Sequence, residues 1–253
     1  EGKALPRLAG KPEGINTDYY NYGSGSLAEI HVHNGEFLHK IGLRGQGMRI
    51  AMLDGGFFDY PSLDAFDSVN VNAQVLNTWD FVSRNATVTD DHPHGMQCFS
   101  IIAANIPGQF IGKAPKASFY LFRTEDVSSE FPIEEFNWAC GAERADSSGA
   151  DIISSSLGYG YQFSSPVPDY PYSDLNGDIT MSARAADLAA KKGLIVFNSA
   201  GNSGTDYWHM ITTPADGDSV LAVGSVSVSG VVANNSSYAP SADGGIKPAV
   251  ASV

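Results

Sequence analysis

The chain has 253 residues, of which 43% are hydrophobic and 17% charged, and its formal net charge is −13. These values are typical of a globular chain with a sizeable core, and so acidic a surface disfavours nucleic acid and anionic membranes as partners, because their phosphate groups would be repelled. No apolar run reaches the roughly 18 residues that a membrane-spanning helix needs. No signal peptide is recognisable at Glu1, so we expect a cytosolic protein or the mature or trimmed part of an exported one.

The first part of the chain differs in character from the rest. Residues 1–44 are rich in glycine and polar residues, and YNYGSGS is their most turn-like stretch. We predict that residues 1–44 form an extension packed on a single domain that occupies residues 45–253. The chain has two cysteines, Cys98 and Cys140, which are too few for a disulfide framework. We expect both to be small buried apolar residues, and whether they pair is left open.

Strand-like and helix-like segments alternate along residues 45–253. Short apolar runs bounded by turn residues predict strands at 48–54, 117–123, 150–158, 194–202 and 219–228. Helix start and stop signals predict helices at 95–105, 132–149 and 179–193. This alternation predicts an α/β fold of three layers, in which right-handed crossovers build a central parallel sheet with helices on both faces.

In such a sheet, functional groups gather beyond the carboxyl ends of the strands. Asp54 closes the first predicted strand, and His94 opens a helix later in the chain. A carboxylate that accepts a hydrogen bond from an imidazole fixes its tautomer and leaves the other ring nitrogen as a general base. Taken alone, a plain strand end and a helix cap are the commoner explanations of these two residues.

Several further segments, in the same order, resemble the motifs of the subtilisin-like serine proteases, or subtilases. The resemblance covers residues 45–253 and rests on MRIAMLDGG, HGMQCFSIIAA, IGKAPKASFYLFRTED, SSSLGYG, VFNSAGNSG and SYAPSADGGIKPAVA. It implies a subtilisin-like fold. A weaker match, HNGEFLHKIGLRGQG, resembles the subtilases of Bacteroidetes-type bacteria.

The resemblance also implies the roles of individual residues. The catalytic residues would be Asp54, which orients the base, His94, which is the base, and Asn202, which donates its amide to the oxyanion. Two segments would bind substrate: a strand that pairs with the substrate backbone and one wall of the primary specificity pocket. Their residues are Ser156, Leu157 and Gly158 in the first, and Ser199, Ala200 and Gly201 in the second.

The chain departs from the family pattern near the catalytic pair. Gly55 stands where the family has Thr or Ser, which removes a hydroxyl near the Asp54 carboxylate. Cys98 lies four residues after His94 and therefore on the same helix face. Some subtilases with a cysteine at this position are sensitive to mercurials, and we expect the same sensitivity here.

The nucleophile segment of the family, G-T-S-x-A-x-P, does not occur before Val253. Ser219 in GDSV mimics a hydrolase serine, but it opens an apolar strand, where we expect a buried structural serine. We therefore interpret the chain as the larger part of a serine endopeptidase that hydrolyses extended protein segments through an acyl-enzyme, with its serine beyond Val253. The alternatives are a catalytically incomplete, peptide-binding pseudo-protease and an unrelated hydrolase with Ser219 exposed beside His94.

The resemblance implies no required cofactor and is compatible with a structural calcium ion. Asp174, Asn176 and Asp178 in DLNGD have the spacing of calcium-loop ligands, although Ile179 in place of glycine excludes an EF-hand. The alternative is a turn that leads into a helix with Asp178 as its N-cap. The expected partners are a polypeptide substrate and a pro-segment or C-terminal fragment, with no nucleic acid, and the expected location is secreted or periplasmic.

Overall fold

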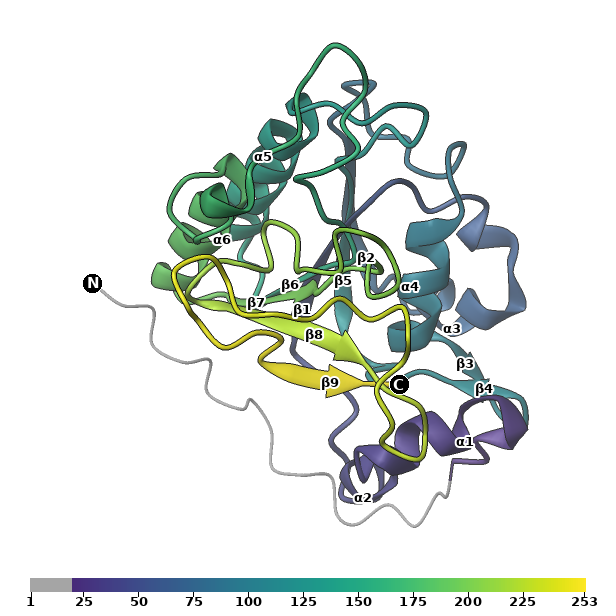
Figure 1. Cartoon of the computed structure of the whole chain (residues 1–253). Coiled ribbons are helices and arrows are strands. Elements are labelled where there is room, and N and C mark those ends of the chain that lie inside the picture. The colour runs from purple at the N-terminus through teal and green to yellow at the C-terminus, as the bar shows by residue number, and fades with distance from the viewer. Residues whose placement is uncertain (1–19) are drawn as a thin grey trace.

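A seven-stranded parallel sheet forms the centre of the computed structural model, which describes residues 20–253 (Figure 1). Each neighbouring pair of strands is parallel, so the carboxyl ends of all seven strands lie at one edge. This arrangement confirms the predicted parallel α/β sheet. In spatial order the strands are β2 (Val75–Asp80), β5 (Ser118–Arg123), β1 (Arg49–Asp54), β6 (Ile152–Ser155), β7 (Ile195–Ser199), β8 (Val220–Ser225) and β9 (Val250–Ser252).

Helices cover both faces of the sheet, as the sequence predicts. α5 (Ile133–Ser148) and α6 (Met181–Lys191) lie together on one face, and α4 (His94–Ala103) and α3 (Asp67–Val71) lie on the other (Figure 1). No helix within residues 20–253 is both long enough and apolar enough to cross a membrane. Short 3-10 turns occur at Tyr60–Ser62, Asp64–Phe66 and Tyr172–Asp174.

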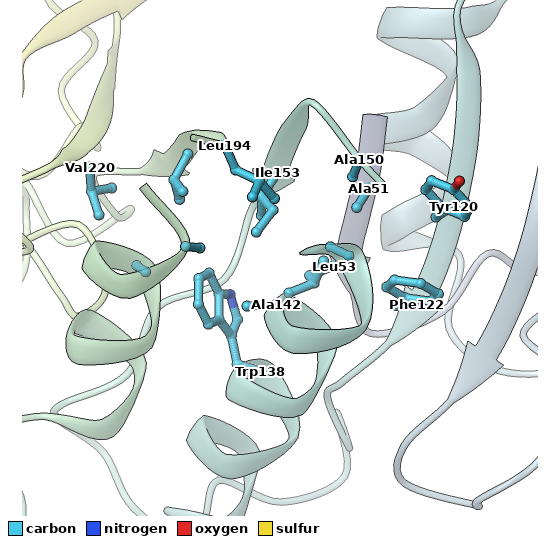
Figure 2. Packing of buried hydrophobic residues seen from close by; sticks show 14 of the residues in the cluster. Ala51, Leu53, Tyr120, Phe122, Trp138, Ala142, Ala150, Ile153, Leu194 and Val220 are labelled. Carbon is cyan, nitrogen blue, oxygen red and sulfur yellow. The ribbon is translucent and has the colours of Figure 1, made fainter. Parts of the chain in front are cut away.

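The apolar strands contribute side chains to two separate cores, because successive side chains of a strand point to opposite faces of the sheet. In β1, Ala51 and Leu53 face α5 and α6, whereas Ile50 and Met52 face α4. Since both faces are buried, the strand is apolar at every position from Ile50 to Leu53 rather than at alternate ones. Figure 2 shows the core on the α5 side, where Trp138 reaches up from its helix toward the sheet.

The ends of the two long helices follow ordinary capping rules. α5 ends at Ser148 and is capped by Gly149, whose φ of +80° is the left-handed conformation that suits glycine. α6 begins after Thr180, whose side chain accepts a hydrogen bond from the Ala183 N–H. The expected N-cap at Asp178 is therefore wrong, because Thr180 has the extended backbone that places an oxygen over the first turn.

Residues 20–44 form two helices that pack against the domain at a small hairpin. α1 (Gly23–Val32) is followed by α2 (Gly35–Lys40), and the hairpin consists of β3 (Asn105–Ile106) and β4 (Phe110–Ile111). The Ser26 hydroxyl accepts a hydrogen bond from the Ile111 N–H, which ties α1 to the hairpin. The rest of the predicted extension, residues 1–19, lies outside the described residues.

Candidate active site

Asp54 and His94 meet at the carboxyl edge of the sheet. Asp54 ends β1 and is buried, and His94 is the first residue of α4. The His94 Nδ1 lies 2.8 Å from the Asp54 Oδ1, which also accepts a hydrogen bond of 2.7 Å from the Gly55 N–H. The hydrogen bond to Asp54 raises the pKa of His94 above its ordinary value, although partial burial opposes the shift. The carboxylate thus orients the ring and favours its protonated form.

Close packing between the first turn of α4 and the end of β1 makes this contact. A Cβ added to Gly95 would lie 2.4 Å from the Gly56 carbonyl oxygen and 2.8 Å from the Asp54 Cβ. Both distances are shorter than van der Waals contact, so a side chain at Gly95 would push the helix away. The glycine after the histidine is therefore a steric requirement for the contact between the ring and the carboxylate.

Cys98 lies one helical turn after His94 and shares its surroundings. One ligand atom each of Asp54, His94 and Cys98 lies within 4.8 Å of the others. Burial and the nearby Asp54 carboxylate raise the pKa of the Cys98 thiol to about 11, although the nearby Ser156 opposes the shift. Both cysteines are free, and Cys140 is exposed rather than buried as expected, because it lies on the outer side of α5.

The second half of the site is a cavity of about 290 Å³ at the carboxyl ends of β6 to β9. It brings together residues that are far apart in the sequence, including Ser156, Ser199, Gly201, Asn202 and Ser252. Ser156 is close enough to the Cys98 thiol to lower its pKa, so this cavity adjoins the Asp54–His94 pair. The predicted substrate strand, pocket wall and amide donor therefore converge on one region.

The other predicted binding residues support the cavity without lining it. The Leu157 carbonyl accepts a hydrogen bond from the Asn198 side chain, and Ala200 is fully buried. Gly158 packs so tightly that an added Cβ would lie 2.2 Å from the Thr212 Oγ1.

Asn202 is an exposed residue that lines this cavity. Its amide oxygen accepts a long hydrogen bond of 3.4 Å from the Asn235 side chain. Because the oxygen faces Asn235, the amide N–H groups are the part of Asn202 that could donate to a ligand in the cavity.

An acidic cluster that was not predicted from the sequence lies near the site. Carboxylate oxygens of Glu125, Glu130 and Glu134 lie within 4.8 Å of one another, and Tyr159 donates a hydrogen bond to Glu125. Burial raises the pKa of Glu130 to about 7, and burial and neighbouring charges raise the pKa of Glu125. A Cβ on Gly55 would lie 3.7 Å from the Glu125 Cβ, so the cluster adjoins the end of β1. The sequence feature that could have predicted this cluster is the density of acidic residues in RTEDVSSEFPIEE.

The predicted calcium segment forms an ordinary turn. The Asn176 side-chain oxygen accepts a hydrogen bond from the Asp178 N–H, which is the contact of an Asx turn. Asp174 lies in a 3-10 turn, where its Oδ1 accepts a hydrogen bond from Ser173. These contacts do not support a bound calcium ion, and a structural calcium ion stays a prediction.

Ser219 lies away from the candidate site. It is exposed rather than buried, and its N–H donates to the Asp187 side chain. It precedes β8, and therefore lies at the amino edge of the parallel sheet, whereas Asp54 lies at the carboxyl edge. The sheet thus separates Ser219 from His94, which removes the basis for a hydrolase built on Ser219.

The sequence is similar to known proteins along most of its length. Residues 45–252 match the model of the subtilase family. The chain is 27% identical over 244 residues to the "Serine protease AprX" of Bacillus subtilis (strain 168), a match that covers 88% of this chain and 48% of that protein. It is also 27% identical over 206 residues to the "Subtilisin Savinase" of Lederbergia lenta, covering 81% of this chain and 65% of that protein. The chain thus spans less than two thirds of these relatives.

Solved structures show the same fold at lower sequence identity. The crystal structure of MycP1 from the ESX-1 type VII secretion system superposes with a TM-score of 0.63 and 20% identity, covering 91% of this chain and 64% of that one. MycP1 from Mycobacterium smegmatis superposes with a TM-score of 0.60 at 19% identity, and the match covers 89% of this chain and 62% of that one. At such identities the likeness concerns the fold alone.

Proposed function

The chain belongs to the subtilase family, and we propose that it is the base-bearing part of a serine endopeptidase that cleaves extended protein segments through an acyl-enzyme. The observation that carries the proposal is the 2.8 Å contact between the His94 Nδ1 and the Asp54 Oδ1 at the carboxyl edge of the sheet. A carboxylate on Nδ1 leaves Nε2 as the base that takes the proton of an attacking hydroxyl.

The proposed chemistry uses His94 twice. A serine hydroxyl attacks the scissile carbonyl carbon and passes its proton to the His94 Nε2, and the same nitrogen then protonates the leaving amine. Water attacks the resulting acyl ester by the reverse proton route and regenerates the serine. Throughout both steps Asp54 holds the ring and stabilises its protonated form, as the raised pKa of His94 supports.

The cavity near β9 supports the roles of the remaining residues. Asn202 would donate its amide to the oxyanion as negative charge develops on the carbonyl oxygen. Ser156, Leu157 and Gly158 follow the end of β6, where a substrate backbone could add as a further strand. The segment from Ser199 to Gly201, next to Asn202, would wall the pocket for the substrate side chain.

The serine itself is proposed to follow residue 253. β9 ends at Ser252, at the same edge of the sheet as Asp54, and Ser252 and Val253 line the cavity with Asn202. A chain that continued from β9 would therefore enter the site directly. A pro-segment, a structural calcium ion and a Bacteroidetes-type origin remain predictions from the sequence. Export is supported by a relative named "Minor extracellular protease Vpr", which is 27% identical over 194 residues.

The test is active-site labelling of the full-length protein. A fluorophosphonate should label one serine in a peptide beyond residue 253, and the same preparation should cleave an unfolded protein substrate. His94→Gln should abolish both the labelling and the cleavage, whereas Gln97→Ala, at an exposed residue on α4, should preserve them. If the full-length protein is folded but neither labelled nor active, the pseudo-protease alternative replaces this proposal.

A further inference from the structure

The position of the Asp54 carboxylate depends on the backbone of Gly55. The Asp54 Oδ1 lies 2.8 Å from the His94 Nδ1 and accepts a hydrogen bond from the Gly55 N–H, whereas Oδ2 is buried and has no hydrogen-bond partner among the described residues. A glycine restricts its own backbone angles less than any other residue, and Gly55 has no hydroxyl that could hold the carboxylate. A group that fixes Gly55 would therefore also fix the carboxylate that orients His94.

The Arg123 side chain contacts the Gly55 backbone. Arg123 ends β5 directly beside Asp54 in the register of the sheet, and its side chain is 6% exposed. Its Nε donates a hydrogen bond of 3.2 Å to the Gly55 carbonyl oxygen. Its Nη1 lies 2.9 Å from the Asp80 Oδ2 and 3.1 Å from the Asp91 Oδ2. Because the guanidinium is a rigid planar group, it holds these acceptors at fixed positions relative to one another.

Asp91 belongs to the segment that leads into α4. A Cβ added to Gly56 would lie 2.7 Å from the His92 nitrogen and 3.1 Å from the Asp91 Cβ, so the segment after β1 is in close contact with the segment before His94. Arg123 thus contacts both segments, one through the Gly55 carbonyl and the other through the Asp91 carboxylate.

The charges around Arg123 hold its guanidinium in place. Asp80 is buried, and its Oδ1 accepts hydrogen bonds from the Val82 and Ser83 N–H groups at the end of β2. The Ser83 hydroxyl accepts a further hydrogen bond of 3.2 Å from the Arg123 Nη1. Removing one partner of a buried ion pair is strongly destabilising, so the position of the guanidinium is well defined.

We propose that Arg123 is a positioning residue for the Asp54–His94 pair. Its guanidinium fixes the segment after Asp54 relative to the segment before His94, and so sets the contact between the carboxylate and the ring. A lysine would keep the positive charge, but its single nitrogen cannot occupy the positions of both Nε and Nη1. The effect on catalysis rests on the proposed function, whereas the effect on the His94 ring does not.

Arg123→Lys separates position from charge. We expect the pKa of His94 to fall toward its ordinary value, because the hydrogen bond to Asp54 is the main cause of its increase and would be weakened. An NMR titration of the chain measures this pKa, and the ring signals are identified by their absence in His94→Gln. In the full-length enzyme kcat should fall about 10-fold or more with little change in KM. The matched Arg144→Lys, at an arginine on α5 that donates to Asn77, should change neither.

A second pair of variants tests the Asp91 contact. Asp91→Asn removes the ion pair with Arg123, and Asp90→Asn removes an equal charge from an exposed neighbour. We expect Asp91→Asn to lower both the pKa of His94 and kcat more than Asp90→Asn does. Circular dichroism establishes that each variant is folded. Because the Asp91 side chain is 31% exposed, this pair stays informative if Arg123→Lys does not fold.

The proposal is overturned if a folded Arg123→Lys leaves either the pKa of His94 or the kcat of an active enzyme unchanged, or if Asp91→Asn has no larger effect than Asp90→Asn. A full-length protein in which Arg123→Lys lowers the pKa of His94, but which takes no fluorophosphonate, would retain the positioning role and lose the proposed function. An active enzyme that is indifferent to Arg123→Lys would retain the function and lose the positioning role.

Discussion

Gly95→Ala should separate the proposed base from its carboxylate. The added methyl would lie 2.4 Å from the Gly56 carbonyl oxygen, whereas a carbon and an oxygen in contact need about 3.3 Å. The first turn of α4 must therefore retreat by about 0.9 Å. A retreat of this size would lengthen the 2.8 Å contact between His94 and Asp54 to about 3.7 Å, beyond hydrogen-bond range.

Two consequences of this displacement can be measured. The pKa of His94 should fall toward its ordinary value, because the hydrogen bond to Asp54 is the main cause of its increase, and an NMR titration of the ring protons reports this directly. In the full-length enzyme kcat/KM should drop about 100-fold, as expected for a misplacement of about 1 Å, and its acid limb should shift to lower pH.

The structure provides a control on the same helix. Gln97→Ala changes an exposed residue on α4 and should alter neither the pKa of His94 nor the activity. Overpacking at Gly95 should also reduce the free energy of unfolding by about 1–3 kcal/mol. A folded Gly95→Ala variant with an unchanged pKa of His94 would refute the steric reasoning, since the helix would then accommodate a methyl group without moving its histidine.

Three further predictions follow from the site and the core. Asn202→Ala should lower kcat of the full-length enzyme by about 10²–10³-fold with little change in KM, the loss known for an asparagine donor in subtilisin; a change confined to KM would contradict the role. Because the folded state raises the pKa of Glu125, this carboxyl group stabilises the fold fully in acid, and the contribution is lost as pH rises through the folded pKa, by about 1.4 kcal/mol per pH unit per proton. Between about pH 5 and about pH 8, the free energy of unfolding measured with urea should decline less steeply with pH in Glu125→Gln than in the unaltered chain. Glu143→Gln, at an exposed site on α5, should decline as steeply as the unaltered chain. Equal slopes in the two variants would contradict this role of Glu125. Trp138→Phe should cost about 1–3 kcal/mol in the same assay, because it leaves the buried Ser155 hydroxyl without the indole N–H that lies 3.0 Å away; an unchanged midpoint would show that the hydroxyl finds another partner.

The sequence was informative wherever a local pattern had one physical explanation. The run that became β1 is apolar at successive positions, as expected for a short strand buried on both faces. The edge strand β2 escaped notice because it contains Asn77 and Thr78 and is only half buried. The strand at the opposite edge of the sheet, β9, has three residues and is too short to show a periodic pattern.

Within the candidate site, sequence and structure contributed different information. The resemblance to the subtilase motifs was sufficient to select Asp54, His94 and Asn202 as candidates, and their catalytic roles stay predictions. The unpartnered Oδ2 of Asp54, the proximity of Cys98 and the cluster around Glu125 depended on the tertiary structure. Sequence spacing places a residue at a strand end or on a helix face, but the distance between two atoms also depends on how closely the elements pack, and here a missing Cβ at Gly95 determines that packing.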